Sequence, residues 1–127
     1  MPSREEGTVN PQLLLIIVVG VLVGIGAAFS GLGGGFLMVP LLLMMGFPAQ
    51  KAVGTSFLGI FIISVSALAA HGKLANVDWK IGLLLGLGGL VGAQFGARIV
   101  EHVSTAQFKR IFAMILVGLA AYLFFRK

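Results

Sequence analysis

The chain has 127 residues, of which 58% are hydrophobic and 10% are charged, and a soluble domain of this size could not carry that composition without exposing large apolar patches. The formal net charge is +5, but the nine lysines and arginines lie at the ends of apolar segments, where they meet membrane lipid and water, so nucleic acid is not an expected partner. There is no cysteine, which excludes a disulfide framework and a thiolate metal site.

Residues 1–10 are predicted to form a polar N-terminal tail. Glu5 and Glu6 do not fit the basic first region of a cleavable signal peptide, and the apolar run that follows continues past any normal cleavage point. We therefore expect a tail and not a signal peptide. Asn10–Pro11 is typical of the start of a helix.

Residues 11–127 are predicted to be a single transmembrane domain. Four apolar segments come close to the roughly 20 residues that a helix needs to cross the hydrocarbon core, namely 11–29, 52–70, 81–100 and 108–125. A fifth segment, 35–45, would span only roughly 16 Å as a helix and is too short to cross alone. The predicted fold class is an all-α integral membrane protein with four spanning helices and a short broken or re-entrant helix after a glycine-rich turn.

The glycine-rich stretch Ser30–Pro40 (SGLGGGFLMVP) lies inside a run without a charged residue from Gly7 to Gln50. Backbone that leaves a helix within a membrane must be satisfied by protein, trapped water or a ligand, and such an unwound point is typical of a transport site. Gly33–Gly35 would lie at the N-terminus of the short helix, where the positive end of the helix dipole suits an anion.

A second candidate binding element, Gly54–Ser56 (GTS), lies in the first turn of the segment 52–70 and offers two hydroxyls and exposed amides. Residues 71–80 then form the one extended polar loop that we expect. In the segment 81–100, Gly88, Gly92 and Gly96 recur every four residues, which predicts a tightly packed helix. Ser104 or Thr105 is predicted to cap the last helix.

The predicted substrate-binding residues combine the two turns with one polar side chain of the fourth long segment. They are Gly31, Gly33, Gly34, Gly35, Gly54, Thr55, Ser56 and Gln94, with Ser30, Lys51 and Arg98 as secondary candidates. Each has an alternative role. The glycines could serve helix packing alone, the hydroxyls could bond to carbonyls of their own helix, Gln94 could join helices, and the two cations suit lipid headgroups.

No metal, cofactor or catalytic residue is expected. His71 and His102 fall in predicted polar connections without a second ligand at helical spacing. The four carboxylates lie near segment ends, and no nucleophile is paired with a base, so the chain is not predicted to be an enzyme. The carboxylates are Glu5, Glu6, Asp78 and Glu101.

The cationic side chains do not predict an orientation in the membrane. If the short helix counts as a crossing, five cations fall on one side and four on the other, and a re-entrant short helix gives the same split. So small a bias leaves insertion in both orientations open.

Several of these stretches together resemble the sulfite exporter TauE/SafE family. They are Gly31–Leu42, Met45–Ser56, Val77–Lys80 and Gly92–Arg98, and the resemblance covers about residues 12–125. It implies a secondary carrier that exports small sulfur-containing anions, such as sulfite, sulfoacetate or other organosulfonates, across a prokaryotic inner membrane as a multi-pass protein. Members of this family resemble two copies of such a unit in one chain, so we expect this chain to act as a homodimer. The rival classes are a small accessory membrane protein and a passive anion channel.

Overall fold

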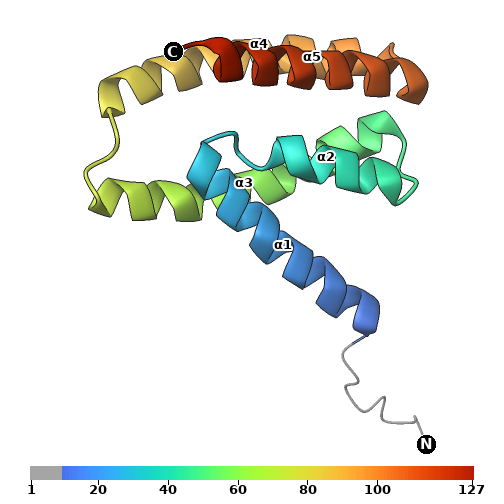
Figure 1. Ribbon diagram of the computed structural model, residues 1–127, viewed down its shortest axis with the longest axis horizontal. Helices are drawn as coiled ribbons and strands as arrows, with labels where there is room; N and C mark the ends of the chain where they lie inside the picture. Colours follow the sequence, from blue (N-terminus) through green and yellow to red (C-terminus); the bar gives the residue numbers. More distant parts are fainter. Residues whose placement is uncertain (1–9) are drawn as a thin grey trace, which may run out of the picture.

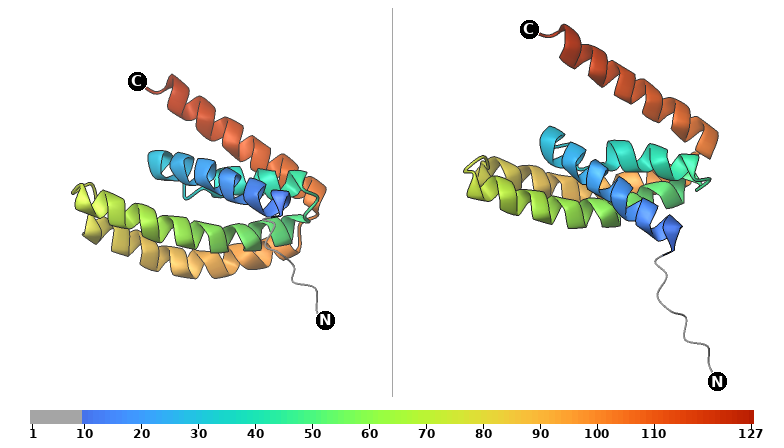
Figure 2. Two further views of the ribbon diagram at one scale, coloured as in Figure 1. Left: turned by 90° about the horizontal axis from the view of Figure 1, so that it is seen from below. Right: turned by 60° about the horizontal axis from the view of Figure 1, so that its bottom comes forward.

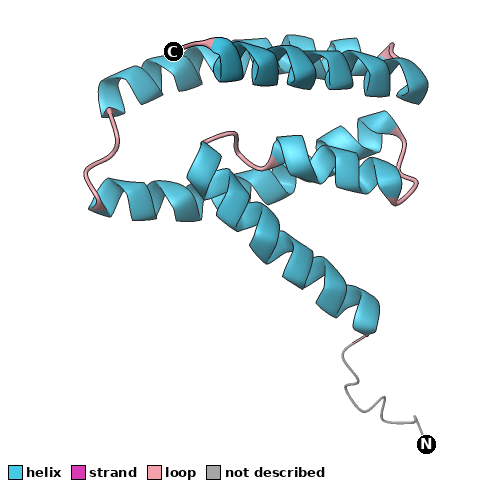
Figure 3. Cartoon of the chain, in the orientation of Figure 1, coloured by secondary structure: helices cyan, strands magenta, loops and turns pink. Residues whose placement is uncertain are grey.

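The computed structural model describes residues 10–127, which form five helices and no strand (Figures 1 and 3). The helices are α1 (Pro11–Ser30), α2 (Gly35–Met44), α3 (Ala49–Lys73), α4 (Trp79–Glu101) and α5 (Thr105–Phe125). All except α2 are long and apolar enough to cross a membrane. The predicted all-α membrane fold with a short additional helix is confirmed, whereas residues 1–9 of the predicted tail lie outside the described residues.

Local capping residues fix the helix starts. Asn10 caps α1 by accepting a hydrogen bond from the amide of Gln12 (3.1 Å), with Pro11 at the first helical position as predicted. Ser104 and Gln107 form a capping box at the start of α5, each side chain accepting from the backbone amide of the other at 3.2 Å. Asp78 caps α4 by accepting from the amide of Ile81 (3.0 Å).

The long helices extend beyond their apolar segments, which corrects the predicted boundaries. Helix α3 begins at Ala49 and ends at Lys73, not at 52 and 70, and α5 begins at Thr105, not at 108. The predicted polar loop 71–80 therefore shrinks to residues 74–78. The reason is that caps and turn residues end a helix, whereas hydropathy marks only the part that suits lipid.

Helices α1 and α3 end on the same side of the molecule, and α2 runs back along the first half of α3 (Figure 1). A Cβ added to Gly35 would lie 2.9 Å from Cδ1 of Ile60, the twelfth of the 25 residues of α3. The glycine turn thus lies beside the middle of α3. From there α2 returns the chain to the end at which α3 begins.

The core lies where α2 meets the first turn of α3. It consists of Val39 and Leu43 of α2 with Ala49 and Ala52 of α3, and both alanines are fully buried. Their small side chains let the two helices approach closely. Stacked rings of Phe108 and Phe112, with centroids 5.5 Å apart, cover this core from α5.

A polar clasp, formed by Gln50 and Thr105, holds α3 to the turn between α4 and α5. The amide of Ala49 donates to Oγ1 of Thr105 (3.1 Å), which replaces the side-chain cap that Pro48 lacks. Nε2 of Gln50 donates to the carbonyls of Val100 (3.0 Å) and Val103 (2.8 Å). This clasp could not be predicted from the sequence, because the residues that it joins lie 50 or more positions apart.

Helices α4 and α5 pack loosely within the described part of the chain. Figure 2 shows α4 running beside α3 while α5 diverges from the other helices, and neither α4 nor α5 has a buried residue. A Cβ added to Gly88, Gly92 or Gly96 would meet no atom within 4 Å in residues 10–127. The predicted tight packing of this helix is therefore wrong within one chain, because small residues permit close contact but need a partner helix to make it.

Candidate functional site

The helical path breaks at the glycine turn, as predicted. Gly31, Gly33 and Gly34 have φ angles of +72°, +72° and +79°, in the left-handed region that glycine adopts without strain. Gly31 closes α1 by donating its amide to the carbonyl of Ala27 (2.8 Å). Gly34 stands at the N-cap of α2 and carries no side chain, so the first amides of α2 receive no side-chain cap. Gly35, the first residue of α2, is half-buried.

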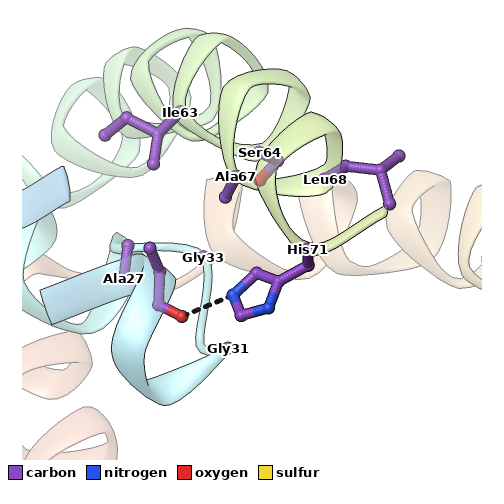
Figure 4. Close-up of a pocket in the computed structure, with 9 residues that line it drawn as sticks. Ala27, Gly31, Gly33, Ile63, Ser64, Ala67, Leu68 and His71 are labelled. Atoms are coloured by element: carbon purple, nitrogen blue, oxygen red, sulfur yellow. Dashed lines mark hydrogen bonds between the residues drawn. The ribbon is translucent and has the colours of Figure 1, made fainter. Parts of the chain in front are cut away.

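A cavity of about 360 Å³, here called the turn cavity, opens between this turn, the end of α1 and the second half of α3 (Figure 4). Its walls are mostly apolar, and its two polar side chains are Ser64 and His71. The volume suits a small ligand. The full lining is Ala27, Ala28, Gly31, Gly33, Ile63, Ser64, Ala67, Leu68 and His71.

His71 projects from the last turn of α3 toward the end of α1 (Figure 4). Its ring is half-buried, and Nε2 lies 3.0 Å from the carbonyl oxygen of Ala28. Ala28 belongs to the last turn of α1, whose carbonyls lack helical partners. The predicted position of His71 in a loop is wrong. The missed signal was the spacing of Ser64, Ala67, Leu68 and His71 at i, i+3, i+4 and i+7, which places them on one helix face.

Gly54–Ser56 does not lie at a helix N-terminus, which corrects the prediction. Because α3 begins at Ala49, the three residues occupy its second turn and their amides lie within the helix. Thr55 is exposed, whereas Ser56 is 1% exposed and donates its hydroxyl to the carbonyl of Val53 (2.7 Å). The hydroxyl of Ser56 thus bonds to a carbonyl of its own helix, which is the alternative to anion binding given above for the hydroxyls of Thr55 and Ser56.

A second cavity, of about 620 Å³, lies between the first half of α3 and the second half of α4. It brings together Gly54 and Gln94, two of the predicted site residues, with the side chains of Gln50, Glu101 and Phe108. Neither cavity is lined both by the glycine turn and by Gly54. One chain thus separates the two predicted binding elements.

The secondary candidates lie outside both cavities. Ser30 donates its hydroxyl to the carbonyl of Gly26 (2.7 Å), which closes the last turn of α1. Lys51 is exposed, with Nζ 5.7 Å from the ring centroid of Phe47, and Arg98 is exposed near the end of α4. These positions suit anchors at a membrane surface.

Comparison with known proteins gives a family. The model of the family described as sulfite exporter TauE/SafE matches residues 15–127. A "Probable membrane transporter protein" of Methanocaldococcus jannaschii is 36% identical over 118 residues, which cover 87% of this chain and 44% of that protein. The "Probable membrane transporter protein YunE" of Bacillus subtilis is 31% identical over 97% of this chain and 45% of its own length.

A third relative, the "Probable membrane transporter protein" of Xylella fastidiosa strain 9a5c, is 28% identical over 98% of this chain and 49% of its own. The chain thus spans about half the length of these curated relatives. No solved structure matches it. The family model covers nearly the whole chain, and the chain therefore belongs to the sulfite exporter TauE/SafE family.

Proposed function

We propose that the chain acts in a secondary transporter that exports small sulfur-containing anions, such as sulfite, sulfoacetate or other organosulfonates, across a prokaryotic inner membrane. The observation that carries this proposal is the run of left-handed glycines beside the middle of α3, at the uncapped start of α2. The family description and the relatives' names support a transport role.

The chemistry of the glycine turn suits a transported anion, which must be released from its site as well as bound there. Uncapped amides at the start of α2 present partial positive charge, and within a membrane they need a partner. None of the residues that line the turn cavity is a lysine or arginine. A fixed cation would hold a sulfonate more tightly but slow its release, so amide dipoles favour transport over retention.

We further propose that two copies of the chain form the working unit, with each copy supplying one glycine turn and one Gly54–Ser56 element to a shared path. Within residues 10–127 these elements line different cavities, and α4 and α5 bury no residue. A second copy of the chain could cover the exposed sides of α4 and α5. It would also bring a second set of the proposed site residues alongside the first.

The test is anion flux in proteoliposomes, with Gly34→Ala as the site variant and Gly20→Ala as a control. A Cβ at Gly20 meets nothing within 4 Å, and the residue lies in the regular part of α1. We expect saturable sulfonate flux that Gly34→Ala abolishes and Gly20→Ala retains. Flux that rises linearly without saturation would indicate a channel. Absence of both flux and anion-dependent thermal stabilisation would indicate an accessory protein.

A further inference from the structure

His71 is the one titratable side chain among the residues that line the turn cavity. Helix α1, whose last turn lines this cavity, and helix α2, which follows the glycine turn, contain no charged or titratable residue. Within residues 10–127, the charged side chains at this end of the molecule are Lys73 of α3, Asp78 and Lys80 at the start of α4, and Arg126 and Lys127 after α5. All five are exposed and outside the cavity, and Asp78 is engaged in capping α4. Among residues 10–127, His71 is therefore the one side chain at this cavity whose charge can change when an anion binds.

The contact with Ala28 decides which ring nitrogen can change its state. A carbonyl oxygen can only accept a hydrogen bond, so Nε2 of His71 carries a proton and donates it. In the neutral ring, Nδ1 then presents a lone pair, which repels an anion. When Nδ1 takes up a proton, the ring becomes positively charged and both nitrogens are donors.

We infer that His71 takes up a proton on Nδ1 together with each anion that enters the turn cavity, so that the anion and the proton are bound and released together. This inference rests on the proposed function. The proton comes from water as the anion binds and returns to water as the anion leaves, while Nε2 keeps its own proton throughout. The Nδ1–H bond forms as an O–H bond of a hydrated proton breaks, and the reverse exchange occurs when the anion leaves.

The energetic reason is that an anion in an apolar cavity is costly unless a positive charge accompanies it. A proton on histidine supplies that charge only while the anion is present, because histidine is the side chain that exchanges a proton most readily near neutral pH. Binding of the anion in the turn cavity and protonation of His71 thus strengthen each other by the same factor.

The experiment counts protons by titration calorimetry of the full chain at slightly alkaline pH, in buffers with different enthalpies of ionisation. Methanesulfonate is the probe, because its sulfonate group does not itself titrate in this range. We expect uptake that approaches one proton per anion bound. In proteoliposomes with a pH-sensitive dye inside, methanesulfonate flux should move protons in the same direction.

Two variants separate a proton carrier from a structural contact. His71→Gln keeps an N–H donor for the carbonyl of Ala28 but cannot take up the proton, so it should lose proton uptake and bind the anion at least tenfold more weakly. His102→Gln is the matched control: this ring is exposed, lies outside both cavities and donates Nδ1 to the carbonyl of Arg98 (2.8 Å). It should behave like the unchanged protein.

Binding of methanesulfonate by the unchanged protein without proton uptake would overturn the role of His71 and leave the proposed transport intact. Proton uptake that persists in the His71→Gln variant would likewise overturn the role of His71 without contradicting the proposed transport. If the unchanged protein neither binds nor moves the anion, the proposed function fails, and the role of His71 fails with it.

Discussion

At the residue scale, the glycines of the turn differ in which neighbouring atoms an added side chain would contact. Gly31 and Gly34 both have positive φ, and a Cβ in that region costs about 1–2 kcal/mol. Around Gly31 there is open space, whereas a Cβ on Gly34 would stand 3.1 Å from Cγ1 of Val23 and 3.3 Å from Cβ of Ala27. Backbone conformation alone therefore accounts for Gly31, and close packing is added at Gly34.

We predict that Gly34→Ala lowers the stability of the protein more than Gly31→Ala does. The first variant should lose about 2–3 kcal/mol and the second about 1–2 kcal/mol, because only the first adds crowding to backbone strain. Thermal unfolding of both variants in the same detergent, followed by circular dichroism, measures the difference. Equal losses would show that the contacts with Val23 and Ala27 do not limit the turn.

The two hydroxyls of α3 should also behave differently from each other. Ser56→Ala removes a buried bond to Val53, and we predict a loss of stability of about 0.5–1.5 kcal/mol. Thr55→Val removes an exposed hydroxyl at nearly constant volume. If this hydroxyl binds the anion, the variant should weaken methanesulfonate affinity by about 1–3 kcal/mol in calorimetry. Unchanged affinity would remove Thr55 from the proposed site.

At the element scale, local signals were sufficient for most of the fold. Asn10–Pro11 and Ser104–Gln107 carry their capping partners within three residues, and the glycine cluster needs no distant partner to break a helix. Contacts between elements were not predictable in this way. His71 reaches Ala28 across 43 positions, and Gln50 reaches Val100 across 50, so their roles appear only once the helices are packed.

The clasp between α3 and the α4–α5 turn should contribute measurably to stability. Gln50→Leu removes the side-chain donor to the carbonyls of Val100 and Val103, of which the carbonyl of Val100 keeps the amide of Val103 as a donor. Thr105→Val leaves the amide of Ala49 without its acceptor. We predict that each variant loses about 1–3 kcal/mol, the range for an unsatisfied buried polar group. Gln12→Leu, at an exposed position of α1, is the control in the same thermal assay.

The double variant of Gln50 and Thr105 tests whether the clasp acts as one unit. Side chains that hold the same turn should couple, so the combined loss should differ from the sum of the single losses by about 0.5 kcal/mol or more. Strict additivity would mean that the two bonds stabilise the turn independently.

At the scale of the whole molecule, charge is balanced between the two ends of the bundle. The end at which α3 begins carries Lys51, Arg98, Lys109 and Arg110, and the opposite end carries Lys73, Lys80, Arg126 and Lys127. Four cations at each end of residues 10–127 give no bias for orientation. The packing is uneven by contrast: the buried residues among 10–127 lie in α1, α2 and α3 and at the N-cap of α2, and α4 and α5 contain none.

We predict that two copies associate through the glycine stripe of α4. A Cβ added to Gly88, Gly92 or Gly96 would meet no atom within 4 Å in residues 10–127, and small residues at this spacing let a partner helix approach closely. Gly92→Leu should therefore weaken the dimer. Gly118→Leu is the matched control, because it adds the same side chain to an equally open position of α5. Light scattering corrected for bound lipid and detergent measures the mass.

The same dimer predicts how activity responds when active and inactive chains are mixed. If each copy supplies one glycine turn to a shared path, a dimer works only when both turns are intact, so flux should fall as the square of the active fraction when Gly34→Ala chains are added. Flux that falls in direct proportion, together with a monomeric mass, would show that each chain works alone. A dimeric mass with proportional flux would place two separate paths in one dimer. The stripe on α4 would then serve assembly, and the glycine turn of each chain would complete its own site.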